Sequence, residues 1–128
     1  MVEQLSPLER HVVQLVGGLL AISSIVGRNY EDFSGGKNRR RVFQYAKKLY
    51  DRFIEEYGSP FCRDIHMKLF GRTFNFFDPK EYAEFEKLGG HIDKCPSVSG
   101  NVARWAAEII LDEIKVKKIE KTGYISEV

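Results

Sequence analysis

The stretch NRRRVFQYAKKLYDRFIEEYG, residues 38–58, decides the fold class. Apolar side chains recur in it every three or four residues, which is the period of an α-helix with one buried face. That face consists of two neighbouring stripes, Val42, Ala46, Leu49 and Phe53 in one and Phe43, Tyr50, Ile54 and Tyr57 in the other. Gly58 follows the last apolar residue and is a typical helix stop. We therefore predict a helix over residues 38–57.

Helix signals continue on the N-terminal side of this stretch. Ser6 and Pro7 have the residue types of a helix cap and first turn, and they predict a helix that ends before Gly27. Gly17 and Gly18 lie in the middle of this helix. A glycine there costs about 1 kcal/mol relative to alanine. The pair therefore predicts that another segment packs unusually close at this point.

Three further helices are predicted on the C-terminal side. They span residues 60–69, after Ser59; residues 79–88, where Asp78, Pro79 and Glu81 form a capping signature; and a last stretch that begins near Pro96 and frays after Lys118. Residues 27–37 and 71–77 are predicted loops, and no segment shows the alternation of a strand. We expect the first, second and last helices to form the hydrophobic core.

These helices predict an all-α, single-domain bundle of four to five helices over residues 1–128, with residues 119–128 as a frayed tail. One domain is the usual content of a chain of this length. The longest apolar run, residues 15–26, falls short of the roughly 20 residues that a membrane helix needs. The N-terminus also lacks the pattern of a signal peptide. We therefore expect a cytoplasmic protein without a membrane partner.

Charge is nearly balanced, with 20 Lys and Arg against 18 Asp and Glu. This balance disfavours nucleic acid as a partner, because nucleic-acid-binding domains are usually strongly basic. Arg39, Arg40 and Arg41 do form a local basic cluster. We interpret it mainly as a solvated helix face, with a phosphate contact as the weaker alternative. The aromatic side chains between residues 74 and 85 are expected to pack the short helices onto the long ones.

The chain contains two cysteines, Cys62 and Cys95, and each stands near a proline at a predicted helix start. The first turn of a helix exposes unpaired amide groups and partial positive charge, which lower the pKa of a thiol. Arg63 and Lys94 add positive charge beside the two cysteines. We therefore predict a reversible dithiol/disulfide pair of Cys62 and Cys95, with Arg63 favouring the thiolate. The alternative is that each cysteine is a small buried hydrophobic residue.

Two histidines extend this pair into a potential set of metal ligands. His66 lies four residues after Cys62, and His91 lies four residues before Cys95. Together, the two cysteines and the two histidines have the composition of a Cys2His2 metal site. Their spacing does not match a known zinc pattern such as Cys-x2-Cys followed by His-x3-His. The residues by themselves require no cofactor.

Three segments resemble the redox-active protein family that is named C_GCAxxG_C_C after its cysteine pattern. They are residues 53–65, which include Cys62-Arg63; residues 94–110, which open with Lys94-Cys95-Pro96; and residues 16–21, which resemble the segment of the family's Gly-Cys-Ala-x-x-Gly motif. The departure is large, because no cysteine precedes Cys62 and the first two family cysteines are therefore missing.

The resemblance implies redox or metal chemistry, and it leaves open whether the family's full cysteine set holds a metal ion, an iron–sulfur cluster or a thiol relay. A four-cysteine cluster cannot be built from one copy of this chain, which has two cysteines. What remains is one disulfide, or a two-thiolate half-site that is completed by histidine or by a second subunit in a homodimer. The alternative is a non-catalytic binding or assembly module that has lost the family's cofactor site. In either case we expect an unidentified redox partner or protein partner.

Overall fold

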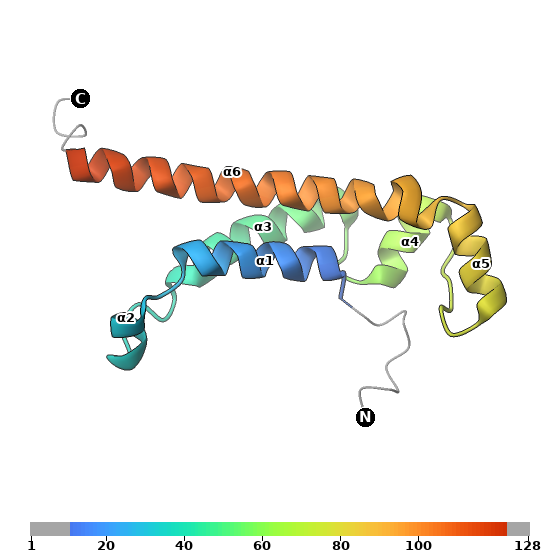
Figure 1. Cartoon of the computed structure of the whole chain (residues 1–128), viewed down its shortest axis with the longest axis horizontal. Helices are drawn as coiled ribbons and strands as arrows, with labels where there is room; N and C mark the ends of the chain where they lie inside the picture. Colours follow the sequence, from blue (N-terminus) through green and yellow to red (C-terminus); the bar gives the residue numbers. More distant parts are fainter. Residues whose placement is uncertain (1–10, 123–128) are drawn as a thin grey trace.

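The computed structural model describes residues 11–122, which form an all-α bundle (Figure 1). The elements are α1 (Val13–Val26), α2 (Tyr30–Ser34), α3 (Arg41–Tyr57), α4 (Cys62–Phe70), α5 (Pro79–Lys87), the short π-helix η3 (Gly90–Lys94) and α6 (Cys95–Thr122). Within residues 11–122 there is no strand, and one isolated β-bridge pairs His11 with Phe61. The predicted fold class is confirmed. Also within these residues, no helix combines the length and the apolar composition needed to cross a membrane.

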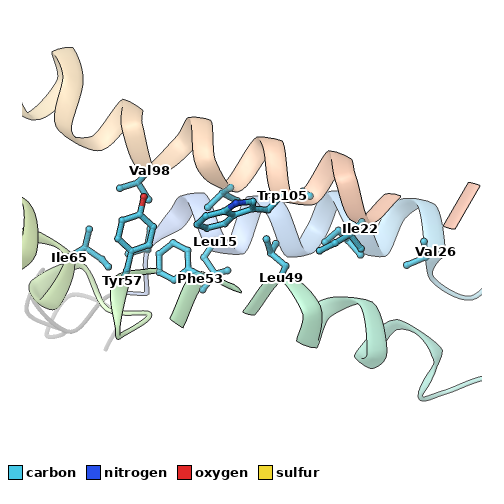
Figure 2. Close-up of a cluster of buried hydrophobic side chains, with 13 residues drawn as sticks. Leu15, Ile22, Val26, Leu49, Phe53, Tyr57, Ile65, Val98 and Trp105 are labelled. Carbon is cyan, nitrogen blue, oxygen red and sulfur yellow. The ribbon is translucent and has the colours of Figure 1, made fainter. Parts of the chain in front are cut away.

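Helices α1, α3 and α6 lie side by side and form the core, as predicted. Figure 1 shows α6 running along the whole molecule, with α4 and α5 gathered at one end and α2 at the other. Figure 2 shows the side chains that fill the space between the three long helices. The largest fully buried ones there are Leu15, Ile22, Val26, Leu49, Phe53 and Val98. The core therefore joins residues from both halves of the chain.

The stripes predicted on α3 are buried unequally. Leu49 and Phe53 are fully buried, and Tyr57 is 8% exposed. Phe43 and Tyr50 of the second stripe are 65% and 40% exposed, so the buried face is narrower than predicted. The main neighbours of α3 are α1 and α6, and they leave these two side chains of α3 uncovered.

The two glycines of α1 have different surroundings. A Cβ atom added at Gly18 would lie 2.6 Å from Cγ1 of Val102 and 2.8 Å from Cδ2 of Leu49. A Cβ atom added at Gly17 would meet nothing within 4 Å. The predicted close approach is therefore confirmed at Gly18 only, where α1 packs against both α3 and α6.

The first helix begins later than predicted. Ser6 and Pro7 lie outside the described residues, but Val12 has an extended backbone and α1 starts at Val13. The N–H of Val12 donates to the carbonyl oxygen of Pro60 at 2.8 Å, beside the bridge between His11 and Phe61. This pairing holds the chain extended and brings the start of α1 next to the start of α4.

Three other boundaries differ from the prediction for local reasons. Helix α3 starts at Arg41 because Asn38 has a left-handed backbone, with φ of 55°, that no α-helix contains. The predicted loop 27–37 contains the short helix α2, whose first turn is capped by the side chain of Asn29. Helix α6 continues beyond Lys118 to Thr122, and residues 123–128 lie outside the described part of the chain.

Candidate functional site

A cavity of about 190 Å³ lies where the start of α1, helix α4, the end of α5 and the start of α6 meet. Its apolar wall includes Val12, Ile65, Phe76, Phe85 and Val98. Its chemically reactive side chains are Cys62, His66, His91 and Cys95. The structure therefore brings both predicted cysteines and both predicted histidines to one cavity, although they come from three different elements.

Cys62 is the first residue of α4. The chain turns into this helix because the N–H of Phe61 donates to the hydroxyl of Ser59 at 3.2 Å, and that hydroxyl donates to the carboxylate of Asp64. No side chain caps the helix start, and the Cys62 thiol is 3.9 Å from the carbonyl oxygen of His11. Cys62 thus occupies a true helix N-terminus, as predicted, within a slightly shorter helix.

Cys95 is the first residue of α6, but this helix continues directly from the π-helix η3. The helical path begins five residues earlier, at Gly90, and the N–H of Cys95 donates to the carbonyl oxygen of Gly90. Such a wide turn tolerates the following Pro96, which has no N–H to continue the regular ladder. The helix start predicted near Cys95 is therefore confirmed, but the amide that would favour a thiolate there is already hydrogen-bonded.

The two preceding glycines make this wide turn fit against α5. Gly89 has a left-handed backbone, with φ of 86°. A Cβ atom added at Gly90 would lie 2.3 Å from Cζ of Phe85. The turn therefore presses directly on the ring of Phe85, which is itself a wall of the cavity.

The pKa of Cys95 is raised, in contrast to the lowered pKa that the sequence predicted. Burial is the main cause, and negative charge on Cys62 and on Glu86 adds to it. No positively charged side chain is among the causes of this shift in the pKa of Cys95. Both cysteines lie within the described residues and no disulfide joins them, and ionisation of Cys62 is one of the causes that raise the pKa of Cys95.

Arg63 lies beside a ring and a carboxylate. Its guanidinium carbon is 5.3 Å from the centre of the Phe61 ring, and its Nε is 3.7 Å from Oδ1 of Asp64. The side chain is half-exposed. These contacts place the positive charge of Arg63 near the start of α4, where Cys62 lies. That Arg63 favours the thiolate of Cys62 stays a prediction.

His66 is the most deeply buried polar side chain of the site, with 6% exposure. Four aromatic rings surround the imidazole at centroid distances of 5.4–5.8 Å, namely those of Phe70, Phe74, Phe76 and Phe85. Its Nδ1 atom has no hydrogen-bond partner, and burial lowers the pKa of the ring. His66 is therefore a neutral imidazole at pH 7. The predicted aromatic packing of the short helices is confirmed at Phe74 and Phe85, each 1% exposed.

His91 lies at the rim of the cavity. Its Nδ1 contacts the carboxylate of Glu86, and its ring meets that of Phe85 edge-on with centroids 5.2 Å apart. Among residues 11–122, no three or more His, Cys, Asp or Glu side chains are arranged to hold a metal ion. Cys62, His66, His91 and Cys95 therefore share a cavity without forming a ligand set here, and the four thiolates of an iron–sulfur cluster are not available in one chain.

The basic cluster at the start of α3 is partly structural. Arg41 pairs with Glu113 of α6 at 3.1 Å, and the hydroxyl of Tyr45 donates to the same carboxylate at 2.5 Å. Arg39 and Arg40 are exposed. The sequence did not reveal this link, because the acceptor lies on a helix far along the chain.

Comparison with known proteins identifies the family. A family model described as "Putative redox-active protein (C_GCAxxG_C_C)" matches residues 14–109. Neither the curated proteins nor the solved structures contain a significant match to the chain. The matched region contains all four reactive side chains of the cavity, and the two upstream family cysteines are absent from the sequence. The chain therefore belongs to the C_GCAxxG_C_C family, as a divergent member that retains two cysteines.

Proposed function

We propose that Cys62 and Cys95 form a reversible dithiol/disulfide pair that exchanges electrons with a substrate or a redox partner. One observation carries the proposal: the two thiols, on α4 and α6, line the same cavity. Membership of a family described as redox-active supports it. A reducing compartment such as the cytoplasm suits the role, because thiols there are kept ready to react.

The surroundings of the two thiols favour different roles for them. Disulfide exchange starts when a thiolate attacks a disulfide sulfur. Cys62 stands at an uncapped helix N-terminus, where partial positive charge favours a thiolate. Burial instead keeps Cys95 protonated at neutral pH, since it raises the pKa of that thiol. We therefore assign the thiolate that attacks the substrate to Cys62. Cys95 is the thiol that then attacks Cys62 and completes the disulfide.

The reaction with a disulfide substrate balances without a further co-reactant. Cys62 as thiolate bonds to one sulfur of the substrate, and the other substrate sulfur leaves as a thiolate. Cys95 then loses its proton and attacks Cys62, which releases the second substrate thiolate. The substrate has gained two electrons, and the protein holds a disulfide between Cys62 and Cys95.

Mass spectrometry of the oxidised protein tests the pairing. We expect mild oxidation with glutathione disulfide, followed by alkylation and proteolysis, to yield a peptide pair that joins Cys62 to Cys95 within one chain. Reduction should restore two alkylation sites. The Cys62→Ser and Cys95→Ser variants are matched controls that can form only mixed disulfides. Two cysteines that remain fully alkylated after oxidation would refute the proposal.

A metal-associated role is the second candidate, because Cys62, His66, His91 and Cys95 all line the cavity. Native mass spectrometry after incubation with zinc or copper(I) would show one ion per chain, or one per dimer, and the ion would be lost in Cys62→Ser. If the thiols are inert and no ion is retained, the chain is a non-catalytic binding or assembly module.

A further inference from the structure

The cavity has the size and the lining of a small-molecule site. Its volume of about 190 Å³ is close to the roughly 150 Å³ of apolar protein cavities that bind a single benzene ring. Valine, isoleucine and phenylalanine side chains make up most of its wall. The carboxylate of Glu86, whose negative charge contributes to the raised pKa of Cys95, is in contact with His91 at the rim. The interior therefore suits a neutral, mainly apolar molecule.

His66 adds one polar group to this apolar interior. The imidazole lines the cavity, yet it is 6% exposed and its Nδ1 has no hydrogen-bond partner. A neutral imidazole carries one donor and one acceptor, and a buried polar group without a partner destabilises a protein. The phenylalanine rings around it offer no conventional hydrogen bond. A molecule in the cavity would meet the imidazole as a buried polar group of the cavity wall.

We propose that the cavity binds a small, neutral, mainly apolar molecule with one hydrogen-bonding group, which pairs with the imidazole of His66 while the apolar part packs against Ile65, Phe85 and Val98. Both thiols line the same cavity, so the bound molecule is within their reach. The inference goes beyond the proposed function, because binding at the imidazole requires no reaction of the two thiols.

Phenol and toluene are matched probes, because they share size and shape and differ in the hydroxyl group. We expect both to bind the reduced, full-length protein in an NMR titration, with phenol about tenfold tighter, which is the value of one good hydrogen bond. In His66→Phe the ring is kept and its nitrogens are lost. Toluene should bind this variant as before, and phenol should lose its tenfold advantage.

Two further variants keep the test decisive. If His66→Phe does not fold, His66→Gln replaces it in the test. The glutamine amide retains hydrogen-bonding capacity, so this variant should retain a preference for phenol. His11→Gln changes a histidine that does not line the cavity and should leave the preference unchanged. Equal binding of phenol and toluene, no binding of either, or a preference that survives in His66→Phe would overturn the inference.

A Cys62→Ala/Cys95→Ala double variant, which adds no hydrogen-bonding group to the cavity, separates this inference from the proposed function. We expect it to bind phenol with the same preference, since the imidazole is unchanged, although it cannot form the disulfide. Binding that depends on His66 together with inert thiols would leave the inference standing and refute the proposed function. A reversible disulfide without probe binding would do the opposite.

Discussion

Burial of one imidazole makes stability depend on pH at the scale of a single residue. The pKa of His66 is lowered in the folded state by burial, so the unfolded chain binds the proton more tightly. Stability should therefore fall as pH drops below about 6.5, the ordinary histidine value. Between pH 7 and pH 5, urea unfolding should show this loss in the wild-type protein and a smaller loss in His66→Phe. Equal losses in the two proteins would contradict it.

The two cysteines should differ in reactivity when each is studied alone. Burial raises the pKa of Cys95, whereas Cys62 begins an uncapped helix. We predict that iodoacetamide modifies Cys62 in the Cys95→Ser variant several-fold faster at pH 7 than it modifies Cys95 in the Cys62→Ser variant. Mass spectrometry over time measures both rates. A faster reaction at Cys95 would reverse the roles assigned to the two thiols.

Helix packing depends on which glycine of α1 faces the core. Gly18→Ala would place a Cβ atom within 3 Å of Val102 and Leu49, so we predict a destabilisation of about 1–3 kcal/mol. In Gly17→Ala the added Cβ atom would have no neighbour within 4 Å. Because alanine favours the helix more than glycine does, this substitution should stabilise the protein by about 0.5–1 kcal/mol. Thermal and urea unfolding of the two variants measure this contrast, and effects of the same sign would contradict the packing.

A polar link joins α3 to α6 beside the apolar core. Glu113 accepts from Tyr45 and Arg41, and the hydrogen bond from Tyr45 is the main reason that the pKa of Glu113 is lowered. This link therefore stabilises the fold above the ordinary carboxyl pKa and is lost as pH falls through the lowered value. Tyr45→Phe should cost about 1 kcal/mol at pH 7 and clearly less at pH 3. An equal cost at both pH values would argue against it.

The elements show why sequence patterns succeed at some boundaries and fail at others. Gly58 and Gly71 end α3 and α4 in left-handed conformations that glycine adopts without strain. Asp78 caps α5 in front of Pro79, as its residue type predicts, but Glu81 binds Arg72 and the N–H of Asn75 and does not close the capping box. Local signals therefore locate a helix end, whereas competing tertiary partners decide what each side chain binds.

The hydrogen-bonded amide of Cys95 was not predicted, because the π-helix that precedes α6 leaves no local signal in the sequence. A proline usually marks the first turn of a helix, but here Pro96 continues a helical path that begins at Gly90. The burial of His66 was equally hidden, since its aromatic neighbours come from α4, α5 and the segment between them. The identity of the reactive residues was readable from the sequence, and their electrostatic surroundings depended on the packing.

At the scale of the whole molecule, three long helices make a scaffold and hold the reactive cavity at one end (Figure 1). The extended pairing of Val12 with Pro60 connects the start of α1 to α4, and the turn at Gly90 connects α5 to α6. We expect residues 1–128 to unfold as a single cooperative domain, because the core is shared by α1, α3 and α6.

A redox titration of the intact protein in graded mixtures of reduced and oxidised dithiothreitol tests the central claim most directly. Trapping by acid and alkylation at each potential reports the fraction of dithiol. A reversible two-electron transition from two alkylated cysteines to none, absent in Cys62→Ser and in Cys95→Ser, is the predicted result. Two cysteines that stay alkylatable at every potential, or that oxidise only between chains, would contradict it.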